Sequence, residues 1–270
     1  MSVPPILYMT TSLGSLPRLA ATITLNRPDE LNSMSAEMIS AFDAALDLVE
    51  ADPEVCVLFI TGAGRSFSAG GDLKKYIELQ KNPVEFAIFV SDLHRVFGRL
   101  RTLNVPTVAL VNGVTAAGGL ELILNCDLAF AAATAKIGDG HLNFGQMGGG
   151  GVLTLLSRFV GIQRASELMF SGKLLSAEEA AAWGIVNRIV NDDDLIKIAM
   201  EFAIQVASKS PLALANAKRV MNQIWLQQLS VTDGLKLELD VNVEYCTTSF
   251  DAPEGLQAFC EKRTPRFEGR

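Results

Sequence analysis

The sequence predicts an α/β fold in which a helical part follows a layered core. Strand-like and helix-like segments alternate through the first two thirds of the 270-residue chain, with no long polar linker. That alternation is typical of helices layered on a mainly parallel sheet. From about residue 176 onward the pattern becomes almost entirely helical. Hydrophobic residues make up 49% of the chain, which is enough to fill a full core.

The predicted strands are short apolar runs. Residues 18–28 (RLAATITLNRP) alternate and are β-branched, which is typical of a strand ending at Pro28. Continuous apolar runs suit strands that are buried in a parallel sheet. Such runs occupy residues 55–62 (VCVLFITG), 106–113 (PTVALVNG) and 127–132 (DLAFAA).

The predicted helices carry apolar residues at helical spacing. The first starts at Ser35, with Glu37 close by in a capping-box-like start, and a second covers about 83–103. Ser176 and Asp193 are expected N-caps, and Pro211 is expected at the first position of a helix. The later helices are expected at 176–184, 192–210, 211–228, 231–248 and 252–263.

Charge and cysteine usage exclude several classes of protein. The formal charge of −7 and the pI of about 5.0 argue against nucleic-acid binding, which needs a basic face. Cysteines 56, 126, 246 and 260 are scattered without a CxxC pair, so we expect buried free thiols and no zinc site. No histidine and acid share metal-ligand spacing, and no signal peptide or membrane span is indicated. We therefore expect a soluble cytoplasmic protein without a metal.

Two loops of small residues share one design. SAGGD (68–72) and AAGG (116–119) each follow a buried strand. Small residues let another backbone or a ligand approach closely, and a helix that begins at each loop leaves its first amides unpaired. Two such amides could point at one oxygen and form an oxyanion hole. The alternative is that both loops are only tight turns.

Glu121 and His141 are the candidate proton carriers. Glu121 lies in the first turn of an expected helix, among apolar neighbours that would raise its pKa. His141 lies in a glycine-flanked loop shortly after Asp139, and it is either an acid/base or a loop histidine bonded to the backbone. His94 lies on a polar helical face and is expected to be structural. The glycines of 147–161 (MGGGGVLTLLSRFVG) form either a flexible turn or a close approach to the site.

Six stretches together resemble the crotonase family, the enoyl-CoA hydratase/isomerase superfamily. In family order they are LNRPDELNSMS, FSAGGDL, NGVTAAGGLELILNCD, FGQMGGGGVLTLLSRFVG, LMFSGKLLSAEEAAAWGIVNRIV and FCEKRTPRF. The resemblance implies a crotonase-like ββα superhelix core with an acyl-CoA site in residues 1–195. It also implies a helical part, 196–270, that closes the CoA site and forms trimers or dimers of trimers. Coenzyme A would be part of the substrate, with no permanently bound cofactor.

The resemblance also implies roles for particular residues. The amides of Gly71 and Gly118 would hold the thioester carbonyl. Of the family's two catalytic glutamates, one falls on Glu121 and the other on His141. The CoA contacts would come from Ala69, Asp72, Leu73, Phe259 and Lys262.

This sequence departs from the family pattern at three positions. Besides His141, Gly148 replaces a usual proline, so we expect the loop there to be wider or more mobile. Glu30 stands where the family often has a basic residue near the CoA phosphates, so we expect the CoA contacts to differ there.

Three functions remain open from the sequence. The first is an acyl-CoA lyase or isomerase with Glu121 as acid/base and His141 as its partner. The second is a hydrolase of a carbon–carbon bond in a cyclic β-diketone, or an acyl-CoA decarboxylase, on the same fold. The third is a binding protein that has lost its chemistry. Acyl chain identity does not follow from the sequence.

Overall fold

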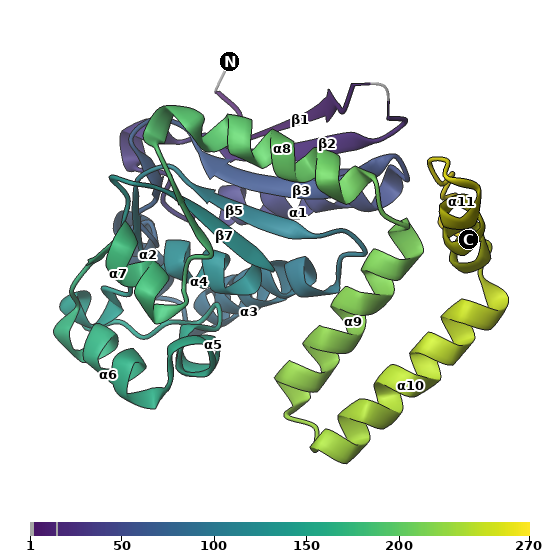
Figure 1. Ribbon diagram of the computed structural model, residues 1–270. Coiled ribbons are helices and arrows are strands. Elements are labelled where there is room, and N and C mark those ends of the chain that lie inside the picture. The colour runs from purple at the N-terminus through teal and green to yellow at the C-terminus, as the bar shows by residue number, and fades with distance from the viewer. Residues whose placement is uncertain (1–2, 15) are drawn as a thin grey trace.

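A six-stranded sheet forms the centre of the protein (Figure 1). The computed structural model describes residues 3–14 and 16–270. The sheet has the order β1-β2-β3-β5-β7-β10, and only β1 runs antiparallel to its neighbour. β1, at the edge, was not expected from the sequence. The strands are β1 (Ile6–Ser12), β2 (Leu19–Leu25), β3 (Val55–Gly62), β5 (Thr107–Val111), β7 (Leu128–Ala132) and β10 (Arg188–Val190).

A smaller sheet carries the loops that matter for function. Its strands are β4 (Ser66–Ser68), β6 (Val114–Ala116), β8 (Lys136–Gly138) and β9 (Leu175–Ser176), in that order. Each of β3, β5 and β7 is followed by a strand of this smaller sheet and then by a helix. The ββα core is therefore confirmed. Each ββα unit takes the chain from a strand of the large sheet to a strand of the smaller sheet.

Two hydrophobic layers cover the two faces of the large sheet. Leu58 and Ile60 of β3 pack with α1 (Ala36–Ala51), α3 (Pro83–Thr102) and α4 (Gly118–Asn125). Val57 and Phe59 point the other way and pack with α8 (Leu195–Ala207). This alternation follows from the two-residue period of a strand. The continuous apolar run of β3 is thus explained by burial on both faces.

The helix starts partly agree with the expectations. The Ser35 side chain accepts a hydrogen bond from the Met38 amide and caps α1. Ser176 caps α7 (Ala177–Trp183) through a reciprocal capping box with Glu179. Asp193 is not an N-cap, because residues 192–194 form a 3₁₀ turn and α8 starts at Leu195.

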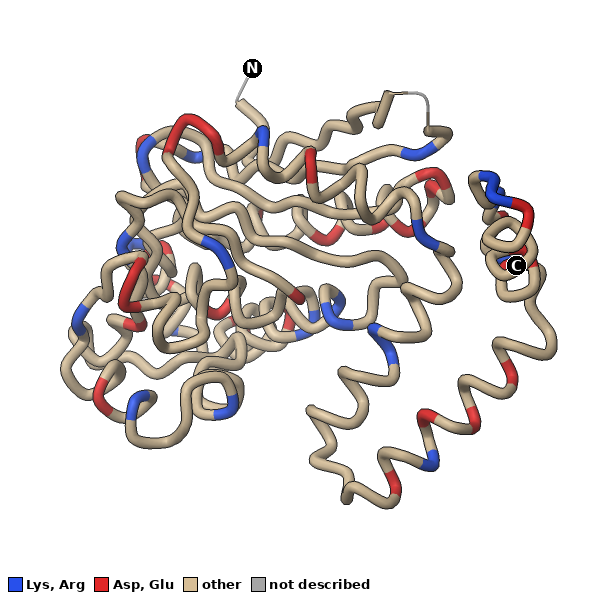
Figure 2. Tube along the Cα trace, in the orientation of Figure 1, with Lys and Arg blue, Asp and Glu red and all other residues tan. Residues whose placement is uncertain are grey.

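Three C-terminal helices extend away from the core (Figure 1). They are α9 (Pro211–Gln227), which begins at proline as expected, α10 (Val231–Thr248) and α11 (Asp251–Glu261). Helix α8, which begins at Leu195, still packs on the sheet. The helices that leave the core therefore begin with α9. Charged residues are distributed along α10, whereas the half of α9 beyond Arg219 carries none (Figure 2).

One buried ammonium anchors this helical arm to the core. The Nζ of Lys218, on α9, donates to the carbonyls of Leu100 at 2.8 Å and Val105 at 2.9 Å. It also lies 2.7 Å from Asp127 Oδ2. Burial lowers the pKa of Lys218, although the negative charge of Asp127 acts to raise it. The three acceptors therefore hold a cation that would otherwise be costly to bury.

Two further features bear on the sequence expectations. Cys56 and Cys126 are buried, but Cys246 and Cys260 are exposed, so the expectation of buried thiols is wrong for half of them. None of the helices in the described ranges is both long enough and apolar enough to cross a membrane.

Candidate active site

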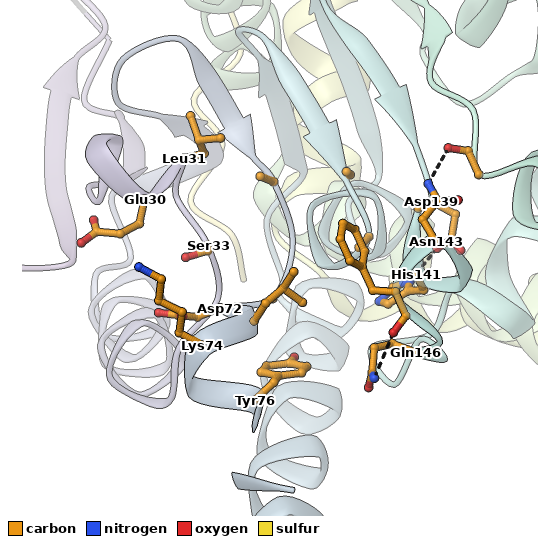
Figure 3. A pocket seen from close by; sticks show the side chains of 18 of the residues that line it. Glu30, Leu31, Ser33, Asp72, Lys74, Tyr76, Asp139, His141, Asn143 and Gln146 are labelled. Atoms are coloured by element: carbon orange, nitrogen blue, oxygen red, sulfur yellow. Dashed lines mark hydrogen bonds and ion pairs between the residues drawn. The ribbon is translucent and has the colours of Figure 1, made fainter. Parts of the chain in front are cut away.

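A pocket of about 680 Å³ opens where the loops of the smaller sheet meet (Figure 3). One wall comes from the loop after β2 and from α2 (Leu73–Leu79), and the opposite wall comes from the 3₁₀ turn η2 (His141–Phe144) and its flanks. The lining includes Glu30, Ala69, Gly71, Asp72, Leu73, Lys74, Tyr76, Ala117, Asp139, His141 and Gln146. Segments far apart in the sequence therefore form a single site.

The two glycine loops touch one another beside this pocket. A bridge to Met34 uses the carbonyl of Gly70 and the amide of Asp72, which leaves the Gly71 amide facing away from Met34. A Cβ added to Gly70, whose φ is +99°, would lie 2.7 Å from the Cβ of Ala117. Only glycine fits at 70, because both the backbone conformation and the neighbouring loop exclude a side chain.

Helix α4 starts without a side-chain cap. Its N-cap residue, Ala117, has φ +48° and ψ −115°, an unusual conformation for a residue with a Cβ. The first amide of the helix belongs to Gly118, which has no intrahelical acceptor by construction. Gly118 itself is buried and does not line the pocket, whereas the preceding residue, Ala117, does. The two candidate amides therefore lie on adjoining loops.

Glu121 is buried, with 1% of its surface exposed, and it lies behind the residues that line the pocket, beside His141. Its Oε1 accepts hydrogen bonds from the amides of Gly150 at 2.8 Å and Val152 at 3.3 Å. Burial raises the pKa of the Glu121 carboxyl, although the charge of His141 and these two amides act in the opposite direction. The bonds fix one oxygen and leave Oε2 directed at His141.

His141 stands between two carboxylates. Its Nδ1 lies 2.7 Å from Asp139 Oδ1, and its Nε2 lies 4.0 Å from Glu121 Oε2. Burial lowers the pKa of His141, but the hydrogen bond and charge of Asp139, with the charge of Glu121, outweigh it and leave the pKa raised. A separation of 4.0 Å is too long for a hydrogen bond. A single water between the two atoms could bond to both.

The glycine loop before α5 (Val152–Val160) packs closely against the side chains of Glu121 and His141. A Cβ at Gly148 would lie 2.6 Å from Glu121 Oε1 and 3.3 Å from His141 Cε1. The loop therefore leaves no room for a side chain at Gly148, and the expectation that it is wider or more mobile than in the family stays a prediction. The functional interpretation of the glycines, a close approach to the site, fits these distances.

The expected CoA contacts divide into two groups. Ala69, Asp72 and Leu73 line the pocket, and Asp72 also caps α2 and pairs with Arg27 at 3.0 Å. Phe259 and Lys262 do not line it. Phe259, 83% exposed, lies on α11, on the side of the molecule opposite α2 (Figure 1). Within one chain, the structure does not bring the two groups together.

Several residues of the site had no role in the sequence-based prediction. Asp139 was noted only as a neighbour of His141. Lys74 and Tyr76 were not singled out at all, although both line the pocket (Figure 3). Glu30 also lines the pocket, and its side chain is 55% exposed. Glu30 carries a negative charge, so the positive charge on this side of the pocket comes from Lys74. No cluster suited to a metal ion occurs among residues 3–14 and 16–270.

The repeated ββα units and the pocket between two glycine loops define a protein of the crotonase class. The sequence matches the family model described as enoyl-CoA hydratase/isomerase over residues 18–270. The chain belongs to the enoyl-CoA hydratase/isomerase family and is an enzyme of that family.

Similar proteins agree along almost the whole chain. A probable enoyl-CoA hydratase of Mycobacterium bovis is 34% identical over 249 residues, covering 92% of this chain and 94% of the relative. A short-chain-enoyl-CoA hydratase of Clostridium acetobutylicum is 33% identical, covering 90% and 92%. The crystal structure of an enoyl-CoA hydratase from Bacillus anthracis has a TM-score of 0.89 at 31% identity, covering 97% and 99%.

Proposed function

We propose that this enzyme adds water across the C2–C3 double bond of a 2-enoyl-CoA thioester and gives a 3-hydroxyacyl-CoA. One observation carries the proposal: Glu121 Oε2 and His141 Nε2 lie 4.0 Å apart, beside the two adjoining glycine loops. Hydration needs both a place for a water and a polarised carbonyl. The names of the similar enoyl-CoA hydratases support the same reaction.

The thioester oxygen is expected to bind between the amides of Gly71 and Gly118. Attack of water at C3 moves electrons through C2 onto this oxygen, so two fixed donors stabilise the developing enolate. The unusual backbone at Ala117 and the positive φ at Gly70 support this arrangement, because both residues lie in the two loops that carry these amides. Donors of this kind contribute on the order of 10²–10³ in rate each.

Glu121 and His141 divide the proton transfers. The Glu121 carboxylate takes a proton from the bound water as the water oxygen bonds to C3. The His141 imidazolium gives its Nε2 proton to C2 of the enolate. The proton on Glu121 then returns to His141, which restores the starting state. Asp139 holds the Nδ1 side of the ring at 2.7 Å, so Nε2 faces Glu121.

The coenzyme A part is expected at the mouth of the pocket, beside Ala69, Asp72 and Leu73. Lys74 lies at the same mouth and is the cation expected to meet the CoA phosphates. Phe259 and Lys262 would complete the site only from α11 of another copy of this chain. That arrangement requires an assembled protein.

The helical arm has the surface that such an assembly needs. Its exposed large apolar residues are Met221 (64%), Val231 (80%), Leu235 (61%), Leu239 (61%), Val243 (53%), Phe250 (37%), Leu256 (73%) and Phe259 (83%). Those of α10 recur every four residues and so form one stripe. A continuous apolar face of this kind is typical of an interface between subunits. We expect a homotrimer or a dimer of trimers.

The Asp139–His141 pair also favours a second function. A histidine held by a carboxylate can act as a base toward water, and it would then split a carbon–carbon bond of a cyclic β-diketone without using CoA. Buried Glu121 has no evident task in that reaction. Calorimetric titration with CoA separates the two, because only the hydratase has a use for CoA binding.

The test is turnover of crotonyl-CoA, followed by loss of the enoyl absorbance. We expect turnover in the wild type, almost none in Glu121→Ala, and a rise in His141→Glu, which restores the two-glutamate arrangement. An inactive wild type that gains nothing in His141→Glu contradicts the proposal. In that case, absence of CoA binding would favour the diketone hydrolase.

A further inference from the structure

Tyr76 presents a phenolic hydroxyl to the pocket that the proposed hydration does not use. It lies on α2, between the side of the pocket that holds Asp72 and Lys74 and the side that holds His141 and Gln146 (Figure 3). The steps described above need only two amides, one glutamate and one histidine. The hydroxyl is therefore available for another contact.

The ring of Tyr76 is fixed in place. It packs edge to face against Phe89, with ring centroids 5.2 Å apart, and against Phe86 at 6.1 Å. A Cβ added to Gly71 would lie 2.8 Å from Tyr76 Cζ and 3.0 Å from its hydroxyl oxygen. The hydroxyl therefore lies beside the amide that is expected to hold the thioester oxygen, close to the reacting carbons.

In the described part of the chain, the fully buried side-chain oxygens without a hydrogen-bond partner belong to Ser66, Asn125 and Asp139, so the Tyr76 hydroxyl is not sealed inside the protein and is open to the pocket that Tyr76 lines. Burial raises the pKa of Tyr76, and the charges of Glu121 and Asp72 raise it further. The phenol therefore stays protonated near neutral pH and can donate. A bound acyl chain that excludes water and is purely aliphatic would leave this donor unpaired, which is unfavourable.

The thioester oxygen is a poor acceptor for Tyr76. A carbonyl oxygen has two lone pairs, and the amides of Gly71 and Gly118 are expected to occupy both. The acceptor must therefore be a different oxygen of the substrate, near C3 or beyond.

We propose that Tyr76 is a specificity-determining residue that donates a hydrogen bond to a second oxygen on the acyl group. The preferred substrates are then 2-enoyl thioesters whose acyl chain carries a hydroxyl, oxo or carboxylate group close to the double bond. This inference rests on the proposed hydration and names the substrate class of the same site.

The experiment compares two substrates that differ by one oxygen, crotonyl-CoA and 4-hydroxycrotonyl-CoA. For each, kcat/KM is measured in the wild type, in Tyr76→Phe and in Tyr8→Phe. Phenylalanine keeps the ring packing and removes only the hydroxyl. Tyr8 lies on β1, away from the pocket, and is the matched control.

The wild type is expected to prefer the hydroxylated substrate. Tyr76→Phe is expected to lower that preference by roughly two- to tenfold, the effect of one neutral hydrogen bond, while Tyr8→Phe keeps it. An equal fall for both substrates overturns the inference, because the hydroxyl would then serve a group common to both. An unchanged preference in Tyr76→Phe overturns it as well. Turnover of crotonyl-CoA by the wild type tests the hydration separately, so the two failures are distinguishable.

Discussion

Replacing Gly150 by alanine tests whether the glycine loop positions the catalytic carboxylate. A Cβ at this position would lie 2.8 Å from Glu121 Oε2 and 3.1 Å from Glu121 Cδ. It would also lie 3.0 Å from Cδ2 of Phe97. Since carbon and oxygen do not approach so closely, the loop and the carboxylate must separate by about half an ångström, which is the tolerance of a catalytic geometry.

The size of the effect follows from the bond that is disturbed. The Gly150 amide donates to Glu121 Oε1 at 2.8 Å, and this bond holds Oε2 toward His141. A hydrogen bond to a charged group contributes about 1.5–3 kcal/mol. If the shift removes that orientation, kcat should fall roughly ten- to a hundredfold, while KM changes little because the CoA contacts remain.

The assay is the steady-state rate with crotonyl-CoA, together with thermal unfolding to confirm that the variant is folded. Gly98→Ala is the matched control, since a Cβ there would lie 3.5 Å from Arg101 Nη2, an ordinary contact within α3. It should keep full activity and gain up to about 1 kcal/mol of stability from helix propensity. A folded Gly150→Ala variant with a kcat within twofold of the wild type would refute the argument.

Three further predictions address the same machinery and its anchor. Glu121→Gln keeps the acceptor for the loop amides but loses the proton carrier, so kcat should fall about 10²- to 10⁴-fold without a lower melting temperature; a loss under tenfold would argue against this role. Asp139→Asn removes the charge that raises the pKa of His141, so the alkaline limb of the kcat profile should move to lower pH, and an unmoved limb would show that Asp139 does not control it. Lys218→Met leaves Asp127 and two carbonyls without their cation, so urea unfolding should show a loss of about 3 kcal/mol; unchanged stability would mean that the arm is held by other contacts.

Much of the layered core was predictable because its strands are buried on both faces. The run at residues 55–62 is continuous and apolar, and it forms β3 as expected. The three-residue strands β4, β6 and β8 were missed, because a strand that short carries no periodicity. Helix α2 was missed for a related reason: it has only seven residues, and none of them is fully buried. The recurring ββα unit gave no fixed period, since its loops and helices differ in length.

The candidate site was predictable only in part. Glu121 was recognised from its apolar surroundings and its glycine loop, which are local features. Its approach to His141 depends on β7 and β8, which carry the chain from α4 back to the same edge of the smaller sheet. The clamp on Glu121 comes from backbone amides at Gly150 and Val152. Those contacts depend on tertiary folding, and side-chain chemistry gives no sign of them. Lys74 and Tyr76 lie on a helix that was itself missed.

The most direct test of the account is the fate of crotonyl-CoA when the wild-type enzyme is incubated with it in ¹⁸O-labelled water. Mass spectrometry of the acyl-CoA product is expected to show one added water, with the labelled oxygen on the acyl chain and the thioester intact. Free CoA together with a labelled carboxylic acid would indicate thioester hydrolysis. That result, or an isomer that lacks the label, would contradict hydration by Glu121 and His141.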